Sequence, residues 1–78
     1  MNRFKEKYNT LKTWQDRALV MTLYHHLMIM KVKKWNERLT AKYFQISLGA
    51  VSTNLKLSKR MSEVRDCSTR KEALEKIK

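Results

Sequence analysis

The chain has 78 residues, of which 42% are hydrophobic. It is therefore long enough for one small domain and too apolar for a wholly disordered chain. Eighteen Lys and Arg residues against seven Asp and Glu residues give a net charge of +11, spread along both halves of the sequence. This charge favours polyanionic partners such as nucleic acid.

Residues 1–9 are polar and basic, and we expect them to form a flexible arm. The start MNRFKEKYNTLKTW lacks the apolar stretch of a secretory signal peptide, and the longest apolar-rich segment, residues 18–30, is shorter than the ~20 residues of a membrane span. Cys67 is the only cysteine, so no internal disulfide is expected. These features predict a soluble cytoplasmic protein with no membrane association.

A long first helix is predicted over residues 13–34. Thr13 and Asp16 form a capping-box-like start, and lysines follow at the end. The apolar positions form two neighbouring rows, which together are wider than one core face requires. The helix is therefore either central to the domain or shared with a second copy, and both remain open. The candidate homodimer residues are Leu19, Leu23, Leu27 and Met30.

Residues 36–57 predict two short helices joined by a turn. Asn36 can cap the first helix, Glu37 to Phe44, and Ser47 can cap the second. The row of Leu57, Met61 and Val64 either continues this helix or follows a kink near Leu57. Thr69 and Glu72 then form a capping box that opens a last helix, within the C-terminal helices of residues 58–78. We therefore predict a single all-α domain of four to five helices that contains a helix-turn-helix.

The helix-turn-helix prediction rests on where small, apolar and polar residues fall. Ala41 is the small residue that a crossing helix requires, Phe44 and Ile46 flank the turn, and Val51 and Leu55 return to the core. The outward positions of the second helix are mostly small, polar or basic. Such a helix suits the major groove of DNA.

The run TAKYFQISLGAVSTNLKLSKRM resembles the helix-turn-helix of ParB- and KorB-type partition proteins and of small phage or plasmid regulators, and STRKEALEKIK resembles the segment that often follows it. The resemblance covers roughly residues 36–78. It implies a helical DNA-binding domain that contacts DNA from the start of the second helix, in a bacterial cell or phage-infected host and associated with the nucleoid. The nucleotide-binding and clamp parts of partition proteins have no counterpart here, so a partition activity does not transfer.

Two positions in this motif are informative. Gln45 stands where the family usually has Gly, and a positive φ there would cost about 1 kcal/mol. Gly49 lies inside a helix, where Gly costs about 0.5–1 kcal/mol relative to Ala. The glycine indicates either a close approach of the helix to DNA or close packing against the first helix.

We therefore expect a sequence-specific double-stranded DNA-binding protein, a transcriptional regulator that acts as a homodimer. The expected DNA-binding residues are Lys42, Ser47, Leu48, Gly49, Ser52, Thr53, Lys56, Lys59 and Arg60. The alternative is a basic protein-interaction module, an adaptor or host-factor inhibitor that uses the motif only as a scaffold; RNA binding is a weaker third possibility.

Neither catalysis nor a cofactor is expected, because the acids are scattered and there is no Gly-rich phosphate loop. His25 and His26 point about 100° apart on a helix and Cys67 has no partner ligand, so no metal site is expected. We expect one of the two histidines to be packed and the other to be exposed.

Overall fold

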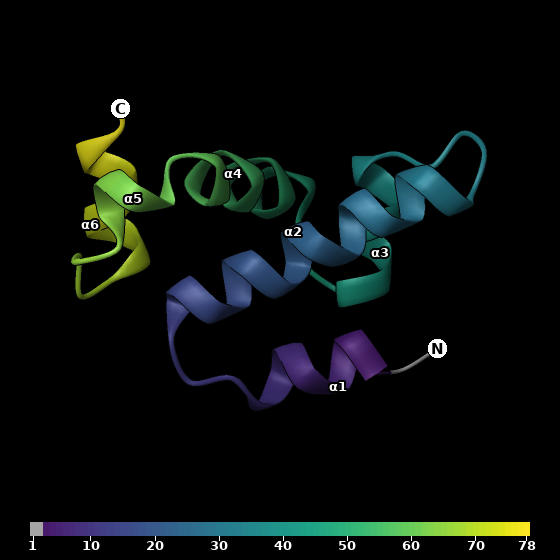
Figure 1. Ribbon diagram of the computed structural model, residues 1–78, viewed down its shortest axis with the longest axis horizontal. Coiled ribbons are helices and arrows are strands. Elements are labelled where there is room, and N and C mark those ends of the chain that lie inside the picture. The colour runs from purple at the N-terminus through teal and green to yellow at the C-terminus, as the bar shows by residue number, and fades with distance from the viewer. Residues whose placement is uncertain (1–2) are drawn as a thin grey trace.

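The structure is a computed structural model that describes residues 3–78, and its regular secondary structure there is entirely helical, as predicted. Along the chain (Figure 1) the helices are α1 (Arg3–Thr10), α2 (Trp14–Lys31), α3 (Glu37–Phe44), α4 (Leu48–Lys59), α5 (Met61–Val64) and α6 (Arg70–Lys76). None of these helices is long and apolar enough to cross a lipid bilayer.

The four predicted helix starts are confirmed by side-chain caps. At each of them a side-chain oxygen accepts a hydrogen bond, of 3.0–3.2 Å, from the backbone N–H three residues later. Each cap gives a partner to one of the N–H groups that a first turn leaves unpaired. The capping residues are Thr13, Asn36, Ser47 and Thr69.

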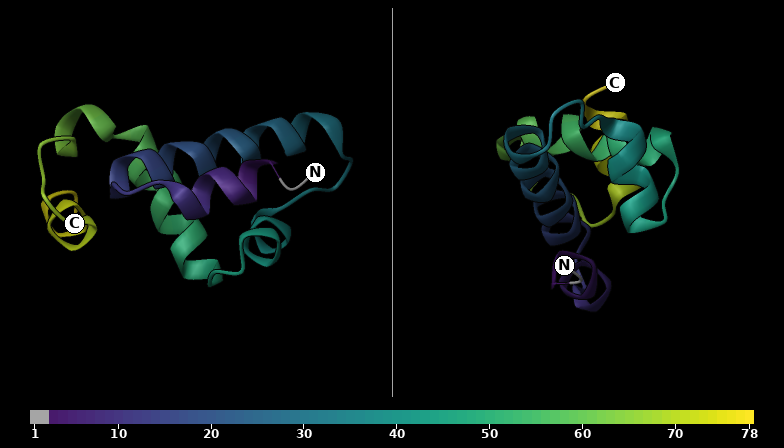
Figure 2. Two further views of the ribbon diagram at one scale, coloured as in Figure 1. Left: turned by 90° about the horizontal axis from the view of Figure 1, so that it is seen from below. Right: turned by 90° about the vertical axis from the view of Figure 1, so that its right-hand side faces the viewer.

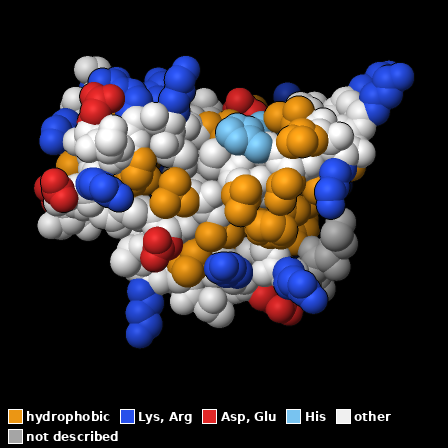
Figure 3. Space-filling model, viewed as in Figure 1, with side chains coloured by type: hydrophobic (Ala, Val, Ile, Leu, Met, Phe, Trp, Pro, Cys, Tyr) orange, Lys and Arg blue, Asp and Glu red, His pale blue; other side chains and the backbone are white. Residues whose placement is uncertain are grey.

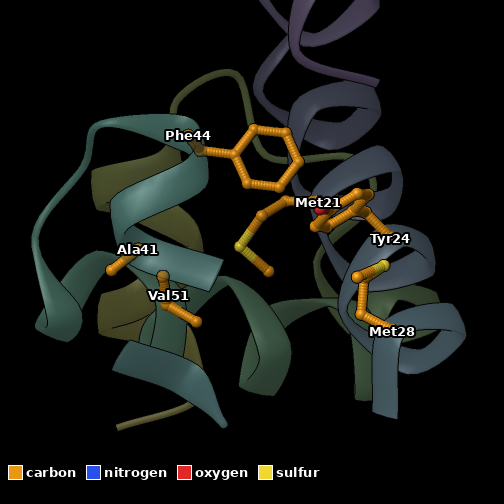
Figure 4. Close-up of a cluster of buried hydrophobic side chains, with 6 residues drawn as sticks. All are labelled: Met21, Tyr24, Met28, Ala41, Phe44 and Val51. Atoms are coloured by element: carbon orange, nitrogen blue, oxygen red, sulfur yellow. The ribbon is translucent and has the colours of Figure 1, made fainter. Parts of the chain in front are cut away.

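α2 is the central helix of the domain. α1 packs on one side of it, and α3 and α4 pack on another (Figures 1 and 2). Their side chains meet in a first core, which Figure 4 shows in close-up. This core consists of Met21, Tyr24, Met28, Ala41, Phe44 and Val51. Apolar side chains removed from water on these two sides of α2 hold the helices together.

The prediction of a flexible arm over residues 1–9 differs from the structure, in which residues 3–10 form α1; residues 1 and 2 lie outside the described part. Phe4 and Tyr8 are one helical turn apart and pack on the first core, with ring centroids 5.3 Å from Tyr24 and 4.9 Å from Phe44 respectively. α1 has no buried residue of its own. Its two aromatic contacts dock it, and they make the described helices six rather than four or five.

A second core holds the C-terminal part of the chain. Leu57, Val64, Ala73 and Ile77 are buried there, with Met61 and Leu74 packed against them. The sequence left open whether the helix continues past Leu57 or kinks near it. In the structure α4 ends at Lys59, and Arg60 leaves the helical conformation before α5 begins. At the other end of this core, the indole N–H of Trp14 donates to the Cys67 carbonyl at 2.9 Å.

Candidate nucleic-acid interface

The connection between α3 and α4 is a turn that passes through a left-handed residue. Gln45 has φ 59° and ψ 46°, the conformation that glycine adopts without cost. The following Ile46 N–H donates to the Ala41 carbonyl at 3.0 Å, which closes the end of α3. The sequence predicts a cost for a positive φ at Gln45, and the structure shows that this positive φ is present.

The face of α4 that points away from the core carries most of the predicted DNA-binding residues. Val51, Asn54 and Leu57 are the buried residues of the helix. At about 100° per residue, the opposite side presents one continuous exposed row. That row, called here the α4 face, consists of Leu48, Gly49, Ser52, Lys56 and Lys59.

Gly49 is not required for packing between helices. A Cβ atom built on it would meet only the Ser47 Oγ, at 4.0 Å, and its φ is not positive. Close packing against the first helix of the motif or against α2 is thus not the reason for this glycine. Of the two explanations given by the sequence, this geometry removes close packing.

The hydroxyl groups near the start of α4 already have partners within the protein. The Ser47 Oγ accepts from the Ala50 N–H at 3.0 Å, and the Thr53 hydroxyl donates to the Gly49 carbonyl at 2.7 Å. Each oxygen keeps hydrogen-bonding capacity for an outside group. Thr53 is half-buried on the flank of α4, whereas Ser52 is exposed on its face.

The two ends of α4 are differently charged surfaces. Lys59 lies about 18 Å along the helix from Ser47. Arg60, just beyond it, binds Glu63 through two hydrogen bonds of 2.7 and 2.8 Å and donates to the Ile77 carbonyl at 3.2 Å. The hydrogen bond from Arg60 lowers the pKa of the Glu63 carboxyl. Arg60 therefore has fewer free donors than the lysines of the α4 face.

α3 contributes a second basic surface beside α4. Lys42 is exposed, and Arg38 is exposed one turn before it. Sequence reasoning missed Arg38, although the i, i+4 spacing to Lys42 was a usable signal. From residue 38 to residue 62 the chain contains no acidic residue. Among residues 3–78 the only ion pair is that of Arg60 and Glu63, so the other cations here are uncompensated.

A buried asparagine on α4 links this helix to α2 and α6, and sequence reasoning missed it too. The Arg70 Nε on α6 donates to the Asn54 Oδ1 at 2.9 Å, and the Asn54 amide lies 3.9 Å from the Met21 sulfur on α2. Asn54 is only 4% exposed. The Arg70 Nη2 also reaches the Ala50 carbonyl at 3.5 Å. α6 thus places a guanidinium along the flank of α4.

The outward side of α2 is apolar and exposed. Leu19, Leu23 and Met30 are 44%, 53% and 82% exposed, and Leu27 is half-buried. Hydrophobic side chains gather over the middle of the molecule in Figure 3, where α2 faces the viewer. The four residues predicted for a dimer interface therefore lie on one side of the helix, with at least part of each side chain open to solvent.

The paired histidines differ as expected. His25 is buried, with its Nδ1 2.6 Å from the Thr40 Oγ1, which also accepts from the Trp35 indole N–H at 2.8 Å; His26 is exposed. Burial lowers the pKa of His25, against a smaller opposing effect of Glu37. No three His, Cys, Asp or Glu side chains of residues 3–78 lie together as metal ligands.

Comparison of the chain with protein-family models, with curated proteins and with solved structures gives no match.

Proposed function

We propose that this chain is a sequence-specific double-stranded DNA-binding protein, without enzymatic activity, that acts as a phage- or plasmid-type transcriptional regulator. In this proposal α3 and α4 form a helix-turn-helix, and α4 enters the major groove with its N-terminal residues toward the bases. Ser47, Gly49 and Ser52 approach base edges and the nearest phosphates, while lysines farther along neutralise the backbone.

The observation that carries the proposal is the composition of the α4 face. It is exposed, contains no acid, and ends in Lys56 and Lys59. Its first turn also contains an uncrowded glycine, whose only neighbour for an added Cβ is a hydroxyl 4.0 Å away. A helix so arranged can approach a polyanion closely at one end and bind its phosphates at the other. The adjoining Lys42 extends the same positive surface onto α3.

A homodimer through α2 completes the proposal, because one recognition helix reads only a few base pairs. The exposed side of α2 has an acid, Asp16, at its start and a base, Lys31, at its end. Two copies packed antiparallel about Leu23 would place Leu19 opposite Leu27 and Asp16 near the partner's Lys31. A two-fold pair therefore matches both apolar and charged groups.

A charge-reversal experiment tests DNA binding. The variant Lys42→Glu/Lys56→Glu should bind random-sequence duplex at least ~50-fold more weakly than wild type at 0.1 M salt, with a flatter salt dependence, because two phosphate contacts are lost. The matched control is Arg3→Glu/Lys7→Glu on α1, which makes the same charge change at exposed positions on the other side of α2. Equal losses in both variants would mean that only overall charge matters.

Selection from a random duplex library then tests specificity. Enrichment of a short palindrome is expected from a two-fold dimer. Enrichment of no sequence would remove the regulatory part of the proposal and leave charge-driven binding.

The alternative function is protein interaction, and the observation that favours it is the exposed apolar side of α2. Such surfaces commonly mark protein partners. Partner binding that survives Lys42→Glu/Lys56→Glu, in a protein with no measurable affinity for duplex DNA at ~50 mM salt, would decide for this alternative.

A further inference from the structure

A basic hollow lies on the flank of α4. Its volume is about 700 Å³, and it is bounded by the α1–α2 connection, the α5–α6 connection and the side of α4 that carries Ala50 and Asn54. The two connections lie at the same end of the molecule (Figure 1). The Gln15 side-chain amide, in the first turn of α2, ties the start of this helix to the α5–α6 connection by donating to the Arg65 and Cys67 carbonyls at 2.9 and 3.1 Å.

The charged residues that line the hollow are all cations. They are Lys12, Arg17 and Arg70, and no Asp or Glu lines it. None of the three forms an ion pair with any residue of the described chain. Arg17 and Arg70 are instead held by neutral groups, since Arg17 Nε donates to the Leu11 carbonyl at 2.9 Å and Arg70 Nε to the Asn54 Oδ1. Three positive charges without a counter-charge, two of them held in place, favour an anion.

The position of the hollow relative to the α4 face indicates which kind of anion it would bind. Around α4, Thr53 lies about 100° from Ser52, and Ala50 lies about 60° farther in the same direction. The hollow therefore opens immediately beside the α4 face. On the other side of Ser52, Leu55 packs on the first core together with α3, and α3 there carries Arg38 and Lys42. Cations thus border both flanks of the same helix.

We infer that the basic hollow binds a phosphate group of the DNA strand that borders the major groove on the side opposite α3. The inference rests on the proposed function, because it requires α4 to lie in the groove. A groove-bound helix has one phosphate backbone on each flank. Arg38 and Lys42 meet one strand, and Lys12, Arg17 and Arg70 meet the other. Arg70 is at the same time a brace, since its bonds to Asn54 and Ala50 hold α6 against α4.

The test compares the salt dependence of binding to random-sequence duplex for two variants with the same charge change. Lys12→Gln/Arg17→Gln should lower the slope of log K against log salt by about 1.8 and weaken binding at 0.1 M salt roughly 60-fold, because each lost phosphate contact contributes about 0.9. Lys33→Gln/Lys34→Gln, at exposed positions in the α2–α3 connection, is the matched control and should have little effect. A slope that falls equally in both variants overturns the inference.

Arg17 also lies over the Tyr8 ring at 5.8 Å, so the double variant also removes a contact with α1. The single variant Lys12→Gln removes a charge from an exposed side chain in a connection and leaves the folding unchanged. It should lower the slope by about 0.9 and the affinity about 8-fold at 0.1 M salt. An unchanged slope in this folded variant overturns the role of Lys12.

A second measurement separates DNA phosphate from free phosphate. Inorganic phosphate is titrated into wild type without DNA while the indole signal of Trp14, which lines the hollow, is followed by NMR. Saturable phosphate binding combined with an unchanged DNA salt slope in the hollow variants assigns the site to a small anion and overturns the DNA assignment. If wild type itself shows no salt-dependent DNA binding, the proposed function and this inference fall together. If the Lys42/Lys56 variant behaves as proposed but the hollow variants match their control, only this inference falls.

Discussion

Single residues in this chain carry identifiable conformational costs, and Gln45 has the clearest one. Its φ of 59° places an L side chain in the left-handed region, where a glycine would relieve a cost of about 1 kcal/mol. Its side chain is exposed, so little packing is lost by removing it. Gln45 therefore lowers the stability of the fold without a visible contact that offsets the cost.

Gln45→Gly should raise the free energy of unfolding by about 1 kcal/mol and the melting temperature by roughly 4–8 °C. Thermal unfolding followed by circular dichroism measures the change. Gln45→Ala is the control, because it removes the same side chain but keeps the Cβ, and it should leave the melting temperature close to that of wild type. A destabilised Gln45→Gly protein would contradict the left-handed turn.

His25 links the stability of the fold to pH. Burial lowers its pKa in the folded state, so the unfolded chain binds the proton more readily. The folded state therefore loses stability as pH falls through the unfolded value of about 6.5, and the loss is complete only below the folded pKa. Melting temperatures measured between pH 7.5 and 5 should decline for wild type and for His26→Gln. They should decline less for His25→Gln, and equal declines in all three would contradict the assignment to His25.

At the scale of elements, a substitution at the start of α4 should change the stability of the fold and its affinity for DNA in opposite directions. Gly49→Ala should raise the free energy of unfolding by about 0.5–1 kcal/mol, because the position is helical and an added Cβ meets no close neighbour. The same methyl group should weaken DNA binding if the helix approaches its target closely at this point. Ser52→Ala, which adds no atoms to the α4 face, is the comparison. A more stable Gly49→Ala protein with wild-type DNA affinity would contradict the close approach.

α1 is stabilised by its contacts with other helices rather than by its own sequence. Its sequence is polar, but Phe4 and Tyr8 insert beside Tyr24 and Phe44. Tyr8→Ala should lower the free energy of unfolding by roughly 1–2 kcal/mol, less than a fully buried aromatic because Tyr8 is half-buried. Lys7→Ala on the exposed side of the same helix should have almost no effect. Equal stability of the two variants in urea denaturation would indicate an undocked arm.

At the scale of the whole molecule, the proposed dimer depends on the outward side of α2. Leu23→Glu should yield a monomer of unchanged melting temperature at low concentration, because Leu23 is already 53% exposed in the single chain. Sedimentation equilibrium measures the change in mass. Leu39→Glu on α3, another half-exposed leucine, is the matched control and should remain a dimer.

The charged ends of α2 give a sharper version of this test. Asp16→Lys should weaken the antiparallel dimer, and the double variant Asp16→Lys/Lys31→Asp should restore it, because each copy would again offer opposite charges at the two ends. Failure of the second change to restore association would contradict the antiparallel arrangement. A wild-type protein that is monomeric at all concentrations would remove the dimer from the proposal.

Much of the secondary structure follows from the sequence by itself, because its signals are local. Thr13, Asn36, Ser47 and Thr69 cap helices through hydrogen bonds that span three residues. Such bonds require no other part of the chain. The α4 face is equally local, because helical periodicity alone places Ser52 and Lys56 on the side opposite the row of Val51, Asn54 and Leu57.

The tertiary structure alone decided the features that depend on distant segments. α1 is helical because its aromatic residues reach a core built by α2 and α3. Asn54 and Thr40 are buried because Arg70 in one case, and His25 with Trp35 in the other, supply partners from elsewhere in the chain. The basic hollow exists because the first turn of α2 is joined to a carbonyl 50 residues farther along the chain, in the α5–α6 connection, by a hydrogen bond of Gln15. A sequence pattern of period 3.6 reports the neighbours along one helix. The partners that another helix brings depend on how the whole chain packs.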